Sequence, residues 1–185
     1  MAITTNDLKN GYVLDIDGDL VSVVQFQHVK PGKGGAFVRT KLKNLVSGAV
    51  VDRTFRAGEK LERVTTEQRT MQFLYRDGDE LVLMDNQTYE QLPVSAASVD
   101  NDDLLAPNTD VQVLFVRERP LRIELPTFVE LEVTATDPGV RGDTVSNVFK
   151  PAELETGASI QVPLFVEQGN RLRVDTRSRE YVTRV

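Results

Sequence analysis

The segment HVKPGKGGAF, at residues 28–37, places one lysine among glycines. Glycines on both sides keep neighbouring side chains away from Lys33, so its ammonium group, or a group attached to it, can enter a narrow space. Pro31 and Gly32 suit the two central positions of a type II turn, and the runs on either side are strand-like. The pattern predicts a β-hairpin with Lys33 at its tip.

Two kinds of lysine chemistry are disfavoured at this tip. A phosphate-binding loop would need Gly-Lys followed by Ser or Thr and then by the start of a helix, and neither follows Lys33. A Schiff-base lysine needs a desolvated pocket, whereas a glycine-flanked tip is exposed. A flexible basic turn without a function remains the alternative to a lysine that acts in a narrow space.

Other residue types exclude several kinds of site. The chain has no cysteine and a single histidine, His28, which excludes disulfides, thiolate catalysis and a multi-histidine metal site. Asp15, Asp17 and Asp19 are spaced like calcium ligands, but the Glu that should follow them and the loop spacing are missing. The sequence predicts no catalytic residue, no metal site and no bound cofactor.

Charge is spread unevenly along the 185 residues, which carry 22 Lys and Arg against 28 Asp and Glu, a net charge of −6. The net charge is +3 in residues 1–64, −7 in residues 65–126 and −2 in residues 127–185. Between Asp19 and Asp52 the charged side chains are all basic. A basic arm on an acidic protein usually faces an anionic partner. A solvated strand face, balanced by acids elsewhere in the fold, is the alternative.

Two groups of basic residues are candidate contacts for the phosphates of an anionic partner, which the family resemblance given below implies to be tRNA or rRNA. The first group lies in the basic arm and consists of His28, Arg39, Lys41 and Lys43. The second is a C-terminal cluster of Arg171, Arg173, Arg177 and Arg179. Charge balance on an exposed strand is the alternative for the cluster, and a surface histidine without a function is the alternative for His28.

Short strands broken by Gly, Asp, Asn and Pro dominate the sequence. In the first block we expect strands at residues 12–16, 20–29, 36–42, 50–55 and 60–64, with a hairpin turn at Asp17-Gly18-Asp19. The second block should have strands at 68–75, 80–84, 89–94, 111–116 and, as an edge strand because of Pro120, 119–124. The third should have strands at 128–135, 160–166, 171–175 and 180–182. A spacing of about ten residues per strand predicts an all-β fold of three small barrels, with domains at 1–64, 65–126 and 127–185.

Local patterns add detail to these strands. In residues 36–42 the inward face should consist of Val38, Thr40 and Leu42, and in residues 128–135 of Val129, Leu131, Val133 and Ala135. A short acidic helix is expected at residues 98–105, with Ser98 as N-cap and Pro107 after its end. Most phenylalanines lie at alternating strand positions. Core packing is therefore preferred over base stacking for Phe26, Phe37, Phe55, Phe73, Phe128, Phe149 and Phe165.

Neither a targeting nor a membrane segment is apparent. The N-terminal residues lack the basic and apolar regions of a secretory signal. No apolar run approaches the ~20 residues of a membrane helix. We expect a soluble, cytoplasmic protein without a membrane contact.

Three segments closely resemble bacterial elongation factor P. The first is the hairpin sequence FQHVKPGKGGAFV of residues 26–38. The second comprises Met84-Asp85 and Thr88-Tyr89-Glu90-Gln91-Leu92. The third begins with PGVRGDTVS at residues 138–146 and continues through Lys150-Pro151-Ala152 and Glu155-Thr156-Gly157 to IQVPLFV at residues 160–166 and Gly169. The matches occur in the same order in all three blocks, so the sequence is similar to this family over essentially its whole length.

The resemblance implies a KOW or SH3-like barrel followed by two OB folds, in an L-shaped arrangement like that of tRNA. It implies binding to the ribosome between the P and E sites and stimulation of peptide-bond formation at consecutive prolines. Holding the CCA end of peptidyl-tRNA raises the fraction of molecules in a reactive geometry. The catalytic groups remain those of the ribosome, so such a protein is a positioning factor and not an enzyme.

Individual residues are implied by the same resemblance. Lys33 falls on the tip residue that carries a covalent extension in several lineages; β-lysylation, another lysine extension and a bare lysine all remain open. The tip loop is shaped by Lys30, Pro31, Gly32, Gly34 and Gly35. A third-domain loop that reaches messenger RNA near the E site is matched by Gly142, Asp143 and Thr144, for which a tight turn is the alternative. The family often has Gly before its C-terminal Glu-Tyr pair, where this chain has Arg179.

The partners implied are the 70S ribosome, P-site peptidyl-tRNA and a lysine-modifying enzyme, and the expected functional state is a monomer. A general single-stranded RNA-binding OB protein is the alternative function. The net charge of −6 argues against it, because only the first block is basic. An enzyme is a third option, which the scarcity of His and Cys disfavours.

Overall fold

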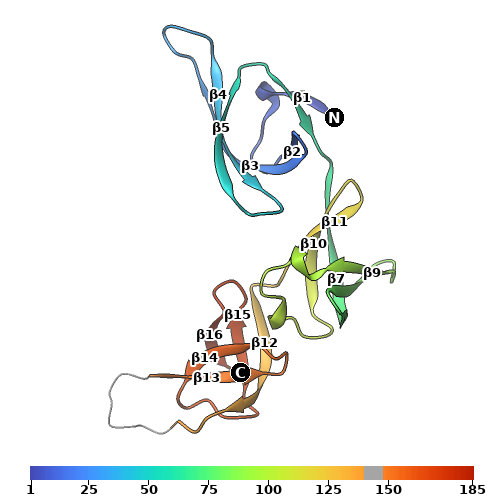
Figure 1. The fold of residues 1–185 in the computed structure, drawn as a ribbon, viewed down its shortest axis with the longest axis vertical. Coiled ribbons are helices and arrows are strands. Elements are labelled where there is room, and N and C mark those ends of the chain that lie inside the picture. The colour runs from blue at the N-terminus through green and yellow to red at the C-terminus, as the bar shows by residue number, and fades with distance from the viewer. Residues whose placement is uncertain (140–147) are drawn as a thin grey trace. The chain divides into compact units, whose positions relative to one another are not determined.

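The computed structural model describes residues 1–139 and 148–185, and this part of the chain is dominated by β-strands (Figure 1). Its strands form three sheets, and its helical elements are short 3₁₀ turns. The predicted all-β class is confirmed. Across the described residues, no helix combines the length and the apolar character that a membrane crossing requires.

The first sheet has the strand order β1-β6-β2-β3-β4-β5. Its strands are β1 (Ala2–Thr4), β2 (Val13–Ile16), β3 (Asp19–Val29), β4 (Phe37–Asn44), β5 (Val50–Arg56) and β6 (Lys60–Arg63), and the 3₁₀ turn η1 (Thr5–Asp7) follows β1. The sequence does not predict β1, because three residues are too few to show a period. The predicted β2–β3 turn is confirmed: Asp17 and Gly18 both have positive φ, 54° and 91°.

A β-bulge in β3 keeps this long strand amphipathic. Val23 is buried in the core before the bulge, and Phe26 packs against the same core beyond it. Val23 and Gln25 pair with adjacent residues of β4, so Val24 is the extra residue. A bulge of this kind shifts the alternation by one position and increases the local twist. The β3–β4 hairpin therefore keeps one apolar face along its length.

The second sheet has the strand order β11-β10-β7-β8-β9. Its strands are β7 (Thr66–Asp77), β8 (Glu80–Asp85), β9 (Gln91–Ser95), β10 (Asp110–Val116) and β11 (Arg119–Glu124). The hairpin expected at Asp77-Gly78 joins β7 to β8, with φ of 59° at Gly78. The strand that contains Pro120 lies at the edge of the sheet, as predicted.

The prediction of an acidic helix at residues 98–105 is wrong. The segment instead contains two 3₁₀ turns, η2 (Ala96–Ser98) and η3 (Asp102–Leu104). Ser98 ends the first turn and does not cap a helix; Val99 is extended, and Asn101 is left-handed with φ of 57°. Leu104 is buried in the core of the third sheet. Tertiary packing of Leu104 therefore outweighs the local helical pattern.

The third sheet has the strand order β14-β13-β12-β15-β16, and β14 also contacts β16, so that the sheet curls into a barrel. Its strands are β12 (Phe128–Thr136), β13 (Phe149–Leu154), β14 (Ser159–Pro163), β15 (Arg171–Asp175) and β16 (Glu180–Arg184). Most of the predicted inward face of β12 is confirmed, because its buried residues are Val129, Leu131 and Val133.

Three details of the third sheet differ from the predictions. The strand expected at residues 160–166 ends at Pro163, and Ala135 is exposed because a bulge follows Val133 in the pairing with β13. The sequence does not predict β13, because the usual alternation of buried apolar and exposed polar residues is reversed at its first two positions. Lys150 points inward and is 7% exposed, whereas Phe149 points outward.

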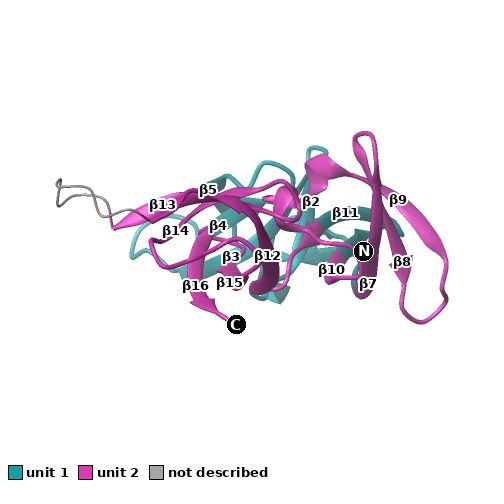
Figure 2. Ribbon diagram, turned by 90° about the horizontal axis from the view of Figure 1, so that it is seen from below, with its two compact units in different colours: residues 1–68, 114–122 teal, residues 69–113, 123–185 magenta. Residues whose placement is uncertain are grey.

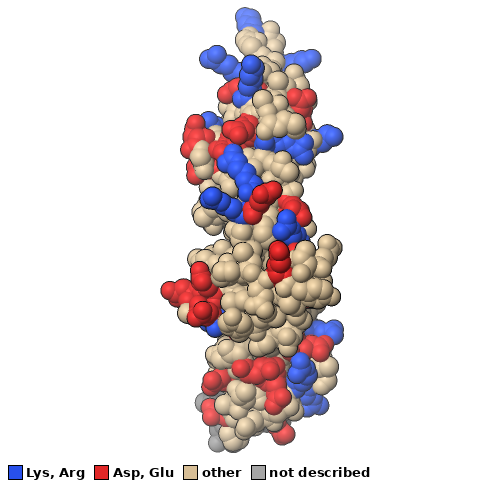
Figure 3. Space-filling view, turned by 90° about the vertical axis from the view of Figure 1, so that its right-hand side faces the viewer, with Lys and Arg blue, Asp and Glu red and all other residues tan. Residues whose placement is uncertain are grey.

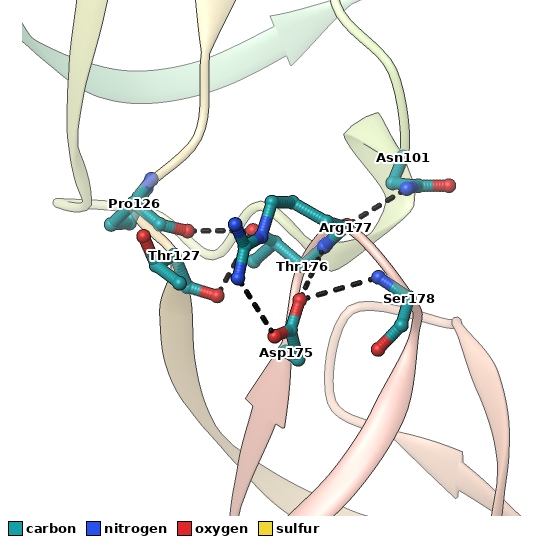
Figure 4. A network of polar contacts seen from close by, with 7 residues as sticks. All are labelled: Asn101, Pro126, Thr127, Asp175, Thr176, Arg177 and Ser178. Atoms are coloured by element: carbon teal, nitrogen blue, oxygen red, sulfur yellow. Dashed lines mark hydrogen bonds and ion pairs between the residues drawn. The ribbon is translucent and has the colours of Figure 1, made fainter.

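Thr176 joins the third sheet to the segment that leads into it. Its hydroxyl donates a hydrogen bond to the carbonyl oxygens of Pro126 at 2.6 Å and of Thr127 at 3.2 Å. Its own carbonyl oxygen accepts a hydrogen bond from the side-chain amide of Asn101 at 2.8 Å (Figure 4). The buried hydroxyl is thereby satisfied, and the η2–η3 region is tied to the β15–β16 turn.

The chain divides into two compact units (Figure 2). One unit holds residues 1–68 and 114–122, and the other holds residues 69–113 and 123–185. The division passes through the second sheet. The boundaries predicted for three domains, and their L-shaped arrangement, stay predictions.

Candidate functional site

Lys33 lies in the loop of residues 30–36 between β3 and β4, and its side chain is exposed. Val29 and Phe37 pair with each other where the loop leaves the hairpin. A Cβ atom built on any of the three glycines of the loop would meet no atom within 4 Å. The space around Lys33 is therefore open, and no packing against the core holds the side chain.

The turn inside this loop is not the type II turn expected at Pro31-Gly32. Such a turn needs positive φ at Gly32, but in this loop positive φ belongs to Gly34, at 102°. The paired strands end at Val29 and Phe37, so the chain does not need to reverse within four residues. The backbone requires glycine at Gly34, where any other side chain would be strained.

A basic face on β4 adjoins the loop. The inward residues of the strand are Val38, Thr40 and Leu42, all of them buried. The outward residues are Arg39, Lys41 and Lys43, as the alternation predicts. Among the described residues no carboxylate lies within ion-pair distance of these three cations, and Asp52 of β5 is the cross-strand partner of Lys41.

A groove of about 410 Å³ runs along β3, β4 and β5. Its lining includes Gln25, Gln27, Arg39, Lys41, Asp52 and Arg53. Figure 3 shows further Lys and Arg atoms at the free end of the β3–β4 hairpin, at the top of the view. Two of the predicted RNA contacts thus line a polar, largely basic concave surface.

His28 is exposed on β3 and lies near the loop end of the hairpin. Its ring packs edge-on against that of Phe26, with the ring centroids 5.8 Å apart. Arg39, on the neighbouring strand, stacks over Phe37, its guanidinium carbon 5.4 Å from the ring centroid. One hairpin therefore carries His28, the β4 cations and Lys33, but His28 pairs with the inward Val38 and lies on the face opposite to Arg39. The roles of these residues stay predictions.

The C-terminal arginines lie in the third domain and are all ion-paired. Arg171 lies 4.0 Å from both Glu130 and Glu155, and Arg173 lies 3.1 Å from Glu130. Arg177 lies 3.4 Å from Asp175. These contacts favour charge balance, the alternative interpretation, for the cluster.

Arg179 makes the strongest of these pairs. Its two terminal nitrogens donate to the two carboxylate oxygens of Asp103 at 2.6 and 2.8 Å. These hydrogen bonds are the main cause that holds the pKa of Asp103 below its ordinary value. Arg179 has φ of 61°, in the region that favours glycine. The position where the family often has Gly therefore carries a strained residue in this chain, and that residue is also ion-paired to Asp103.

The predicted messenger RNA loop, Gly142, Asp143 and Thr144, lies outside the described residues. Among residues 1–139 and 148–185 no cluster of three or more potential metal ligands occurs. Lys33 remains the candidate for a covalent extension, and that role stays a prediction.

The prediction that the phenylalanines pack in the core is wrong for three of them in the third domain. Phe128, Phe149 and Phe165 are 47%, 57% and 56% exposed, whereas Phe55 and Phe73 are buried. The alternation of β12 could have revealed Phe128, because it shares its face with Glu130. No local signal reveals Phe149, because it precedes an inward-pointing lysine.

Family models match three successive parts of the chain. The Elongation factor P (EF-P) KOW-like domain matches residues 4–61, and the Elongation factor P (EF-P) OB domain matches residues 66–123. The model described as Elongation factor P, C-terminal, matches residues 129–184. The chain belongs to the elongation factor P family. The resemblance drawn from the sequence is confirmed, and so are the KOW-like and OB domains.

Relatives agree with this assignment over the full length. Elongation factor P of Acidothermus cellulolyticus is 55% identical over 182 residues, which cover 98% of this chain and 97% of the relative. Elongation factor P of Parafrankia sp. is 56% identical over 183 residues, or 98% of each chain. By family the chain is a translation elongation factor, and this family consists of translation factors and not of classical enzymes.

Solved structures of lower identity share part of the fold. Eukaryotic translation initiation factor 5A from Methanococcus jannaschii has a TM-score of 0.54 and 26% identity, and the match covers 66% of this chain and 93% of that one. A translation initiation factor eif-5a family protein from Naegleria fowleri has a TM-score of 0.51 and 14% identity, and covers 68% of this chain and 98% of that one. The second likeness concerns the fold alone.

Proposed function

We propose that this translation factor binds the 70S ribosome between the P and E sites and positions peptidyl-tRNA for peptide-bond formation at consecutive prolines. Proline is a poor nucleophile and a rigid donor, so the stalled complex samples unproductive geometries. A factor that holds the CCA end raises the population of reactive geometries without supplying a catalytic group. The protein acts in the cytoplasm, as a monomer.

The arrangement of side chains on the β3–β4 hairpin is the main support for the proposal. Its loop presents Lys33 in open space, and its outward β4 face presents Arg39, Lys41 and Lys43, with no carboxylate of the described residues at ion-pair distance. A tRNA acceptor arm is a polyanion that cations of this kind attract. With the arm along β4, Lys33 and any extension attached to it are directed toward the CCA end.

In-vitro translation of a triple-proline reporter tests the proposal, beside a proline-free control reporter. Lys33→Ala should lower rescue of the triple-proline message and leave the control unchanged. Lys30→Ala is the matched variant, because it removes the same charge from the same loop and should impair rescue less. The tip assignment fails if Lys33→Ala rescues as well as the parent.

A general single-stranded RNA-binding protein is distinguished by cosedimentation. The proposed factor should bind ribosomes at moderate salt and should bind unstructured RNA much more weakly. Equal binding to both would overturn the proposal in favour of the alternative. The intact mass of protein purified from its host reports whether an enzyme has extended Lys33.

A further inference from the structure

The loop that carries Lys33 is held only at its two ends. Residues 30–35 make no hydrogen bond and no ion pair with any residue that the structure describes. On the β3 side the last paired residue is Val29. On the β4 side the carbonyl oxygen of Ala36 accepts a hydrogen bond from the amide of Ala57 at 3.1 Å. Ala36 is three residues from Lys33 and is therefore its nearest fixed point along the chain.

The hydrogen bond to Ala36 depends on the turn of residues 56–59, which joins β5 to β6. Ala57 lies in this turn, and the following Gly58 has φ of 79°. The amide of Glu59 donates to the carbonyl oxygen of Arg56 at 3.1 Å, and a carboxylate oxygen of Glu59 accepts from the amide of Arg56 at 3.0 Å. The position of Ala57, and with it that of Ala36, therefore follows the geometry of this turn.

Thr5 holds the same turn from the core side. It is fully buried, with 0% exposure. Its hydroxyl accepts a hydrogen bond from the amide of Gly58 at 2.8 Å and donates one to the carbonyl oxygen of Arg56 at 3.4 Å. Its own amide donates to the carbonyl oxygen of Glu59 at 3.0 Å. Removal of the hydroxyl therefore takes away two of the three hydrogen bonds that tie the turn to Thr5.

We propose that Thr5 is a positioning residue for Lys33. Its hydroxyl fixes the turn, the turn fixes Ala57, and Ala57 fixes the point at which the Lys33 loop leaves β4. A fixed starting point matters for a side chain that must reach a narrow space, because a misplacement of about 1 Å can cost roughly 10²-fold in rate. The inference rests on the proposed function, in which Lys33 is directed toward the CCA end.

Thr5→Val tests the inference, because it keeps the shape of the side chain and removes the hydroxyl. The first measurement is amide hydrogen exchange in the full chain. Exchange at Ala57 should accelerate about tenfold relative to the mean of the β4 amides, because the turn opens locally. Thr5→Ser keeps the hydroxyl and should exchange like the parent. Unchanged relative exchange at Ala57 in Thr5→Val would overturn the inference.

The second measurement is rescue of the triple-proline reporter at increasing concentrations of the factor. Thr5→Val should lower the maximal rate of rescue about tenfold, because bound factor then presents a misplaced lysine. The concentration for half-maximal rescue should change by less than about twofold, because the outward cations of β4 are retained. Thr5→Ser should restore the maximal rate. A purely structural role would give the opposite result, because a smaller folded fraction raises the half-maximal concentration and leaves the maximal rate unchanged.

Val21→Ala is the control for stability. Val21 is buried in the core of the same sheet and pairs with Asn44, at the end of the hairpin opposite to the loop. Its truncation should lower the thermal midpoint and leave the maximal rate of rescue unchanged. An equal loss of maximal rate in Val21→Ala and Thr5→Val would overturn the inference.

Glu59→Ala replaces Thr5→Val in the test if the latter does not fold. Glu59 is exposed, and its truncation removes the acceptor of the Arg56 amide from the solvent side of the turn. Exchange at Ala57 and the maximal rate should both change in the same directions as for Thr5→Val, by smaller factors. Parent values in both measurements would overturn the inference.

Lys33→Ala separates the inference from the proposed function. If Lys33→Ala loses rescue while Thr5→Val keeps the full maximal rate, Thr5 does not position the lysine, and the proposed function stands. If Lys33→Ala rescues as well as the parent, the proposed function fails, and exchange at Ala57 still decides whether Thr5 holds the end of the loop. Loss of maximal rate in both variants, with faster exchange in Thr5→Val, supports both.

Discussion

Lys33 and Lys150 occupy opposite environments, and at the residue scale this contrast predicts opposite effects on stability. Lys33 is exposed in open space, so Lys33→Ala should change the free energy of unfolding by no more than about 0.5 kcal/mol. Lys150 is buried and donates a hydrogen bond of 2.6 Å to the carbonyl oxygen of Asp137. Lys150→Ala leaves that acceptor without its partner and should cost roughly 1–3 kcal/mol. Urea unfolding measures both changes, and equal effects would contradict the assignment of Lys33 to an unpacked tip.

Arg179 combines a strained backbone with a two-point ion pair. Arg179→Ala removes the pair and keeps a side chain at φ of 61°, so it should lower the free energy of unfolding by about 1 kcal/mol, the upper end for partly exposed pairs. Arg179→Gly also loses the pair but relieves the strain, so it should be more stable than Arg179→Ala by about 1 kcal/mol. The reverse order in urea unfolding would show that the backbone is not strained.

The same pair makes a prediction about pH. Hydrogen bonds from Arg179 lower the pKa of Asp103 below its ordinary value of 3.8 in the folded protein. A depressed carboxyl pKa stabilises the fold above the unfolded value, and this contribution is lost as the pH falls through the folded value. The stability difference between the parent and Arg179→Ala should therefore be full at about pH 6 and shrink below about pH 4. A difference that stays constant down to about pH 3 would mean that Asp103 does not respond to Arg179.

At the scale of the element, the two faces of β4 lie in different environments. Its inward residues build the core, and its outward cations are available to a partner. The bulge at Val24 leaves that residue exposed but keeps Val23 and Phe26 of the neighbouring strand β3 on the core side. The outward face can therefore be changed by substitution without changing the stability of the hairpin.

Charge reversal on the outward face tests this separation. Lys41→Glu or Lys43→Glu should weaken ribosome binding and flatten its salt dependence, because each lost phosphate contact lowers the logarithmic salt slope by roughly 0.7–0.9. The free energy of unfolding should change by less than about 0.5 kcal/mol, because both side chains are exposed. Lys60→Glu, an exposed position on β6, makes the same charge change on another strand. If it weakens binding equally, the effect reflects net charge and not the β4 face.

At the scale of the whole molecule, a hairpin distant in sequence completes the first compact unit. Val116, in the β10–β11 hairpin, is buried with Val13 and Val64. Arg117 follows it with φ of 50° and lies 2.9 Å from Asp15 and 3.3 Å from Glu62. The unit that carries the tip therefore depends on residues placed after most of the second sheet.

Val116→Ala should accordingly destabilise the first sheet, by roughly 1–3 kcal/mol for a buried valine. Amide hydrogen exchange should accelerate in β2 and β6. Val113→Ala is the control, because it makes the same substitution at a buried position of the same strand but belongs to the other unit. It should accelerate exchange in β7 and β8, and an identical pattern for both variants would show that the chain unfolds as one unit.

The features that depend on near neighbours can be predicted from the amino-acid sequence alone. Alternation fixed the faces of β4 and most of β12, Asp17-Gly18 fixed a hairpin, and the glycines around Lys33 fixed an open tip. A side chain's direction along a strand, and the φ of a turn, follow from residues one to four positions away. The membership in the elongation factor P family is also readable from such segments.

The features that depend on distant partners become visible when the chain is folded. Arg117 and Asp15 are 102 residues apart in the sequence, and Arg179 and Asp103 are 76 apart. Whether an arginine is neutralised, as Arg179 is, depends on which acid the fold brings to it. Burial also reverses the expected pattern at the start of β13, where Lys150 is buried and Phe149 is exposed. The ammonium group of Lys150 donates a hydrogen bond to the carbonyl oxygen of Asp137. A polar group can be buried where the fold supplies such a partner, and its neighbours in sequence do not reveal that partner.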